Sequence, residues 1–149
     1  MVKKIIATSL LFCSFLAAGC SQNVGVDELK PSETYLNYHA AVAEGISFDQ
    51  DAAYHSIAKQ KEVRAKIEKM QETSEQTLDQ LINLYLQFNQ RAAKCAELIL
   101  REEKIQGKTA YLVFDRKDIC GDGQIKAGGE TITMVEENGW KIHDSLSKY

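Results

Sequence analysis

The chain has 149 residues, of which 44% are hydrophobic and 26% are charged, and this length fits one ordinary domain. A single proline excludes collagen-like and proline-rich disordered proteins. The formal net charge is −3, and removal of the first nineteen residues, which hold two lysines and no acid, would change it to −5. This balance argues against nucleic acid as a partner, because nucleic-acid-binding proteins usually carry a clustered basic face.

The N-terminal segment is typical of a secretory leader. Lys3-Lys4 forms a positively charged start, and Ile5–Leu16 is an apolar run of the length that such signals use. The sequence Leu16-Ala17-Ala18-Gly19-Cys20 then resembles the lipobox of bacterial lipoproteins, although the family prefers leucine where Ala17 stands. The resemblance implies that residues 1–19 are cleaved and that Cys20 is lipidated. The alternative is an ordinary signal peptide that is cut nearby.

The lipobox resemblance also implies a location. Several acyl chains would attach the protein durably to a membrane. Ser21 follows the cysteine, whereas aspartate at this place retains lipoproteins in the inner membrane of enteric-type bacteria, so we expect the outer membrane, facing the periplasm. Residues 20–31 have no hydrophobic period and are interpreted as a tether to a domain over residues 32–149. Beyond the leader, no apolar run reaches the length of a membrane span.

Hydrophobic spacing predicts helices between residues 32 and 93. The first should begin at Ser32 and stop at Gly45. Residues 47–50 (Ser-Phe-Asp-Gln) form a capping box for the next helix, whose apolar stripe fails at residues 58–61, where we expect a break. Residues 73–76 (Thr-Ser-Glu-Gln) form a second capping box. It opens the strongest predicted helix, whose apolar stripe is expected to be core rather than a binding surface: Leu78, Leu81, Ile82, Tyr85, Phe88 and Ala92.

The period changes after residue 93, and four strands are predicted over residues 95–105, 108–115, 131–137 and 140–146. Gln106-Gly107 and Asn138-Gly139 are the expected turns. A two-residue turn at 138–139 would pair Val135 with Ile142. It would also place Trp140, Ile142 and Leu146 on the core face. The predicted class is therefore α+β, with N-terminal helices packed on a curved antiparallel sheet of about four strands. The alternative is a helical hairpin with a small β tail.

Several segments are similar to a family of small bacterial lipoproteins of unknown function. That family has the cone-shaped fold of nuclear transport factor two and ketosteroid isomerase. The resemblance covers roughly residues 32–146 and implies a fold rather than an activity. The segments that carry it are Ser32-Glu33-Thr34-Tyr35-Leu36, Ile46-Ser47-Phe48-Asp49, Tyr54-His55-Ser56-Ile57, Ile105-Gln106-Gly107-Lys108-Thr109-Ala110-Tyr111-Leu112-Val113 and Thr133-Met134-Val135-Glu136-Glu137-Asn138-Gly139-Trp140-Lys141-Ile142.

The cysteines predict one disulfide. Cys13 would leave with the leader and Cys20 would carry lipid, which leaves Cys95 and Cys120 in an oxidising compartment. A turn at 106–107 would place Cys95 opposite Asp118, two residues from Cys120. We therefore expect these two cysteines to pair, the alternative being two reduced buried thiols.

No catalytic set, metal site or cofactor is predicted. The three histidines, at positions 39, 55 and 143, lie at no metal-ligand spacing, and residues 118–123 lack the pattern of a calcium loop and are interpreted as a tight turn. We expect a non-catalytic protein that binds a partner protein or a small apolar ligand, with a homodimer through the sheet face as a further option. A pocket of about 300 Å³ or more would favour the small ligand. The candidate pocket or core residues are Tyr35, Tyr38, Tyr85, Tyr111 and Trp140.

The alternative function is a small enzyme of the ketosteroid-isomerase type. Enzymes with the cone-shaped fold place an acid or a base inside the cone. The candidates in this chain are Asp115, Asp144 and Tyr111. This alternative requires at least two titratable groups to converge inside the fold.

Overall fold

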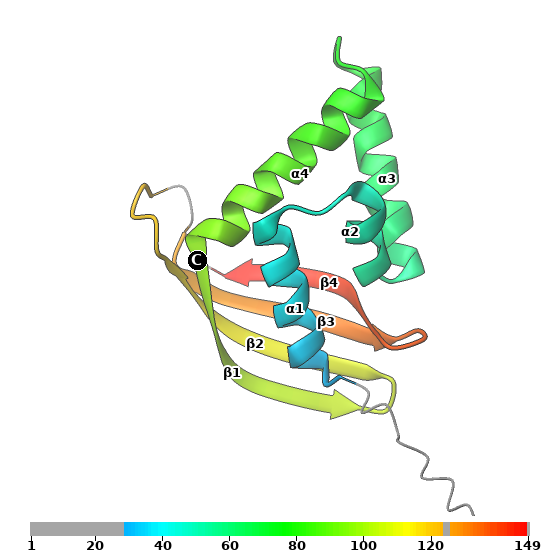
Figure 1. The fold of residues 1–149 in the computed structure, drawn as a ribbon. Helices are drawn as coiled ribbons and strands as arrows, with labels where there is room; N and C mark the ends of the chain where they lie inside the picture. Colours follow the sequence, from blue (N-terminus) through cyan, green and yellow to red (C-terminus); the bar gives the residue numbers. More distant parts are fainter. Residues whose placement is uncertain (1–28, 124–125, 149) are drawn as a thin grey trace, which may run out of the picture.

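The computed structural model describes residues 29–123 and 126–148. Within them, four helices precede four strands (Figure 1). The helices are α1 (Pro31–Glu44), α2 (Phe48–Tyr54), α3 (Ile57–Glu72) and α4 (Leu78–Cys95). The strands β1 (Ala96–Gln106), β2 (Thr109–Asp118), β3 (Gly128–Glu136) and β4 (Trp140–Lys148) form one antiparallel sheet in the order β1-β2-β3-β4.

The predicted α+β class is confirmed, and the helical hairpin with a small β tail is wrong. The strands are nine to eleven residues long and pair continuously across the sheet. Figure 1 shows that the strands bend and that α1 lies across one face of the sheet. No helix among the described residues is both long enough and apolar enough to cross a membrane.

Helix α1 begins one residue earlier than expected. Helix α1 starts at Pro31, a favourable first helical residue because proline lacks the amide hydrogen that would have no partner there. The amide and the hydroxyl of Ser32 both donate to the Glu103 carboxylate of β1, each at 3.0 Å. These contacts fix the start of α1 on the sheet.

The expected break at residues 58–61 is misplaced, because the helix breaks at His55-Ser56. Ser47 caps α2 as predicted, accepting from the Gln50 amide at 3.2 Å. The Ser56 amide then donates to the Ile142 carbonyl of β4 at 2.9 Å, a contact that a continuous helix could not make. The polar residues that suggested the break continue α3, where the Gln60 side chain donates to the Ala52 and His55 carbonyls, both at 2.9 Å.

The predicted cap of the longest helix is also displaced. Thr73 ends α3, and α4 is capped by Thr77, whose hydroxyl accepts from the Gln80 amide at 3.3 Å. The Gln80 side chain accepts from the Thr77 amide at 2.8 Å, which completes a capping box. The chain thus contains two consecutive capping patterns, at residues 73–76 and 77–80, and the second one starts the helix.

Both hairpin turns differ from the predicted ones by one residue. In the first, Gln106 pairs with Thr109, so the turn is Gly107-Lys108, with Gly107 at φ +60°. In the second, Glu136 pairs with Trp140 across a three-residue loop in which Asn138 has φ +54°. A non-glycine residue rarely adopts this left-handed conformation, but asparagine tolerates it.

A bulge in β4 decides which side chains face the helices. Met134 rather than Val135 pairs with Ile142, and Thr133 then pairs with Asp144, which leaves His143 as an extra residue. This insertion reverses the alternation, so Leu146 lies opposite Thr131 on the outer face and is 57% exposed. Ile142 is buried as predicted, whereas the expectation that Leu146 shares its core face is wrong.

The core lies between α1 and the inner face of the sheet. Its members alternate along the two central strands and pair across them. Tyr35 of α1 packs on Phe114 with ring centroids 5.3 Å apart. The buried cluster consists of Tyr35, Ala110, Leu112, Phe114, Ile132, Met134 and Ile142.

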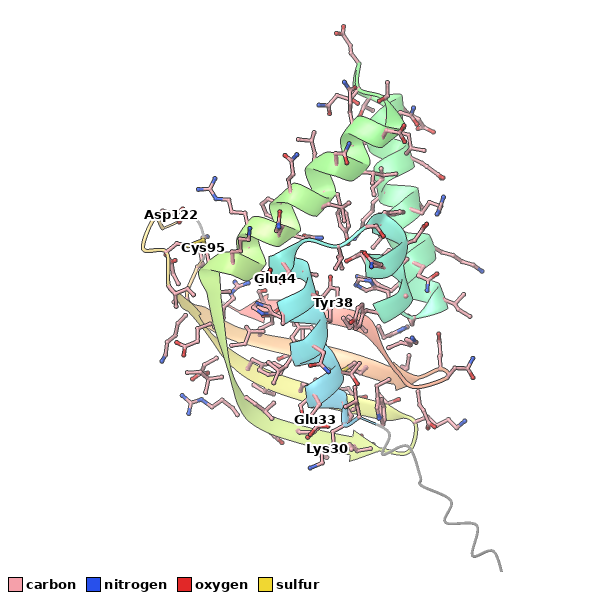
Figure 2. The ribbon with its side chains drawn as sticks, viewed as in Figure 1. Lys30, Glu33, Tyr38, Glu44, Cys95 and Asp122 are labelled. Carbon is pink, nitrogen blue, oxygen red and sulfur yellow. A yellow bond between two sulfur atoms is a disulfide. The ribbon has the colours of Figure 1, made fainter. Side chains whose placement is uncertain are left out.

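The structure confirms the predicted disulfide between Cys95 and Cys120, whose Cα atoms are 5.0 Å apart. The register is shifted by one residue from the predicted one, since Ala96 lies opposite Asp118. The Ile119 amide donates to the Cys95 carbonyl at 2.9 Å, which brings Cys120 alongside. Figure 2 shows Cys95 where α4 passes into β1, close to the loop that carries Asp122.

Candidate functional site

A cleft of about 590 Å³ lies between the helices and the inner face of the sheet. Helices α3 and α4 meet near their connection and diverge toward the sheet, as Figure 1 shows. Their facing sides form the apolar walls, while α1, His55 and the strands supply a more polar floor. The apolar walls include Val63, Ile67, Met70, Leu81, Leu84 and Phe88.

Much of this apolar wall is open to solvent. Phe88 is 75% exposed and Met70 is 50% exposed, although both line the cleft. The expectation that the α4 stripe is core is therefore wrong for Phe88. Leu81, in the same stripe, is only 2% exposed. The divergence of α3 from α4 leaves the middle of the stripe without a covering element, and such exposed apolar surface is characteristic of binding sites.

A buried carboxylate lies under the cleft. Asp51 of α2 is 2% exposed and accepts hydrogen bonds from the Tyr38 hydroxyl at 2.9 Å and the Tyr85 hydroxyl at 3.0 Å. The two tyrosines belong to α1 and α4, so one carboxylate joins three helices. A carboxylate can be buried at moderate cost only when such donors satisfy it.

Burial and neighbouring carboxylates keep the tyrosines of the cleft protonated. Burial is the main cause that raises the pKa of Tyr38 and of Tyr85, and the charge of Asp51 raises both further. Burial likewise raises the pKa of Tyr35, whose hydroxyl donates to Glu130 at 3.1 Å. The three hydroxyls are therefore hydrogen-bond donors to carboxylates.

Two histidines also line the cleft. Burial lowers the pKa of His39, which favours its neutral form. His55 is 7% exposed; its Nδ1 lies 2.9 Å from the Asp51 carbonyl oxygen and 3.6 Å from the carboxylate oxygen Oδ2 of the same residue. The Tyr38 and His55 rings are in edge contact, with centroids 5.4 Å apart.

The structure places three of the five predicted pocket residues in the cleft, namely Tyr35, Tyr38 and Tyr85. Tyr111 does not belong to this group, because it pairs with Thr133 on the outer face of the sheet and is 40% exposed. Trp140 packs against the core and lines a separate hollow of about 580 Å³ beside Tyr54.

The acids proposed for the enzyme alternative lie outside the cleft. Asp115 is exposed and accepts from Arg101 at 2.6 Å. Asp144 was expected on the face of Ile142, but the bulge in β4 moves it off that face. Its carboxylate is exposed and lies 3.8 Å from Lys59.

Asp51 and His55 were not identified from the sequence as site residues. Their spacing of four residues behind the capping box at Ser47 would have placed both on one side of a short helix. That signal alone is weak, since it does not show that tyrosines from two other helices meet the same carboxylate.

The described residues include no group of three or more histidine, cysteine, aspartate or glutamate side chains that could hold a metal ion. Residues 118–123 form a turn in which the Asp118 carboxylate accepts from the amides of Cys120, Gly121 and Gly123, at 2.9–3.3 Å. Cys20 and the predicted leader lie outside the described residues.

The chain matches no protein-family model, no curated protein and no solved structure.

Proposed function

We propose that this protein is a membrane-anchored lipoprotein of the bacterial envelope whose α+β domain binds a small apolar molecule. The observation that carries the ligand proposal is the cleft of about 590 Å³ between α3, α4 and the sheet. Its volume falls within the range of about 300–1,000 Å³ that is usual for small-molecule sites. The anchor proposal is supported by the lipobox-like sequence that ends at Cys20.

The shape of the site favours a small molecule over a partner protein. The exposed apolar side chains of α3 and α4 face a concave space with a polar floor, as ligand sites do. On the outer sheet face, Tyr111 and Leu146 are exposed, but nothing in the structure indicates what would cover them. A protein partner or a homodimer is therefore an outcome of the experiment below rather than part of the proposal.

The enzyme alternative is not supported with the residues first considered, because Asp115, Asp144 and Tyr111 do not converge. Asp51 and His55 give it a different pair of titratable groups. However, the hydroxyls of Tyr38 and Tyr85 already donate their hydrogen bonds to the Asp51 carboxylate, so we propose no reaction.

The cleft can be tested by photo-crosslinking in native membranes. Cells that express the full chain would be labelled with a diazirine-bearing fatty acid and irradiated, and the labelled peptides would be mapped by mass spectrometry. We expect labels on α3 and α4, at residues such as Leu84 and Phe88. Labels confined to the outer sheet face, or crosslinks to another protein only, would contradict the small-ligand proposal.

A matched pair of variants gives the control. Ala92 lines the cleft, so Ala92→Trp should fill part of it and reduce labelling at least severalfold. Ala65 lies exposed on α3 and lines none of the hollows described above, so Ala65→Trp should leave labelling unchanged. Equal labelling of the two variants would show that the cleft is not the binding site.

The anchor is tested by Cys20→Ala. We expect this variant to accumulate as an unprocessed or soluble form, whereas the wild type should partition into detergent and carry acyl chains on its first mature residue. Cys13→Ala, within the leader, is the matched control and should be processed normally. An intact mass of the wild type equal to the bare chain from residue 20 or later would show a plain signal peptide instead.

A further inference from the structure

The charged side chains that line the cleft are mainly cationic, although the chain as a whole has a formal net charge of −3. Among the described residues, three cations and one carboxylate line it: Lys59, Lys66, Arg116 and Glu130. The Glu130 carboxylate, and that of Asp51 beneath the cleft, both accept hydrogen bonds from tyrosine hydroxyls. A site with this excess of cations attracts an anion and disfavours a cation.

Lys59 is a largely covered member of this group. Its side chain is only 15% exposed, whereas that of Lys66, two turns further along α3, is 69% exposed. A charge that is covered by protein is screened less by water and salt than an exposed one. The flexible four-carbon stem of lysine also allows the ammonium group to turn toward a ligand in the cleft.

The Lys59 ammonium group has donors that its protein partners leave unused. An ammonium group carries three N–H donors. Lys59 donates one hydrogen bond within the described part of the chain, to the Glu62 carboxylate at 3.2 Å. The Asp144 carboxylate lies 3.8 Å away, beyond hydrogen-bonding distance. Both carboxylates are partly exposed, and Glu62 also pairs with Lys66, so an anion on the cleft side would complete the coordination of Lys59.

The cation and the apolar wall lie on the same face of α3. Val63 and Ile67 follow Lys59 at intervals of four residues, and all three line the cleft. Helix α3 runs from the sheet toward its connection with α4, as Figure 1 shows. A molecule that lies along this face would therefore meet a charge at the sheet end and hydrocarbon beyond it.

We propose that the ligand is an amphiphile whose anionic head, a carboxylate or a phosphate, accepts a hydrogen bond from the Lys59 ammonium group. Its hydrocarbon part lies along the apolar walls formed by α3 and α4. This inference rests on the proposed function, because it names the head group of the molecule that the cleft would bind.

The experiment compares four photo-probes that share one diazirine-bearing chain and differ in the head: a carboxylate, a phosphate monoester, an alcohol and a quaternary ammonium. Isolated membranes that contain the full chain would be irradiated with each probe at mildly alkaline pH. Labels on α3 and α4 would be measured against the amount of probe in the membrane.

We expect the carboxylate or the phosphate to reach half-maximal labelling at about one-tenth of the concentration that the alcohol needs, as a hydrogen bond to a charged group predicts. The tighter of the two anions identifies the head, and the quaternary ammonium should label least. An alcohol or an ammonium probe that labels as tightly as both anions would overturn the inference.

Lys59→Gln is the decisive variant, and Lys69→Gln is its matched control, since Lys69 is exposed on the same helix and does not line the cleft. Lys59→Gln should lose the preference for the anion and keep the labelling by the alcohol, which also shows that the cleft is intact. Lys59→Arg should retain the preference. A preserved preference in Lys59→Gln, or an equal loss in Lys69→Gln, would contradict the assignment of Lys59.

A second measurement needs no variant. The head-group resonance of the tighter anion, ¹³C for the carboxylate or ³¹P for the phosphate, should titrate about one pH unit lower on the wild-type protein than in empty vesicles, because the ammonium group stabilises the ionised head. Titration at the same pH or a higher one would overturn the inference. Failure of the proposed function gives a different result: no probe would label α3 and α4 in a way that Ala92→Trp reduces.

Discussion

At the scale of single residues, Asp51 is the group whose environment most constrains this fold. It is buried, and its carboxylate is satisfied by donors from two other helices. Removing a donor from a buried carboxylate costs more than removing an exposed hydrogen bond, because the charge stays behind in a poorly solvated place.

Tyr38→Phe should therefore lower the free energy of unfolding by about 1.5–3 kcal/mol, the usual effect of a hydrogen bond to a charged group. Tyr85→Phe should act in the same direction, and the two effects should not add, because both hydroxyls serve Asp51. Urea unfolding followed by circular dichroism measures the two single variants and the double variant. Tyr111→Phe, on the outer face of the sheet, is the control and should change stability by less than about 0.5 kcal/mol.

At the scale of elements, capping residues determine where a helix begins, and the sequence contains two capping patterns in front of α4. Thr73 and Thr77 are each followed three residues later by glutamine. The structure uses Thr77, and Thr73 instead donates to the Met70 carbonyl at the end of α3. The two threonines form a natural pair for comparison.

Thr77→Ala should destabilise the protein by about 1 kcal/mol, because the first turn of α4 loses its side-chain acceptor. Thr73→Ala should have a smaller effect, since its hydrogen bond is exposed. Thermal unfolding of both variants measures the difference. A larger loss for Thr73→Ala would mean that the helix starts where the first capping pattern places it.

At the scale of the whole molecule, the Cys95–Cys120 disulfide ties the junction of α4 and β1 to the end of β2. The two cysteines are 25 residues apart, so the bond closes a loop of moderate length. It restricts the unfolded chain where the helical half of the molecule meets the sheet.

Replacing both cysteines by serine should lower the free energy of unfolding by about 3 kcal/mol, because the unfolded chain is then no longer restricted by the cross-link. A reducing agent should lower the unfolding midpoint of the wild type to a similar extent and leave that of the double variant unchanged. If the wild type proves insensitive to reduction under unfolding conditions, the two cysteines are not joined in the protein.

The sequence by itself determined the features that depend on near neighbours. The period of apolar residues predicted helices followed by strands. The capping box at Ser47 was found, and the second hairpin turn was located to within one residue, because their chemistry is local. The even pair of cysteines after residue 20 also indicated the disulfide, although the predicted register was wrong by one residue.

Only the tertiary structure decided which of these residues make the site. One inserted residue, His143, reverses the faces of β4 and moves Asp144 and Leu146 away from the side of Ile142, and no period in the sequence marks a single insertion.

The apolar stripe of α4 was expected to be core, because the spacing of its residues is the same whether or not another element covers them. The divergence of α3 from α4 leaves Phe88 exposed. The Asp51 carboxylate meets tyrosines 13 and 34 residues away. Such contacts depend on how helices cross, which is settled by the packing of the whole chain.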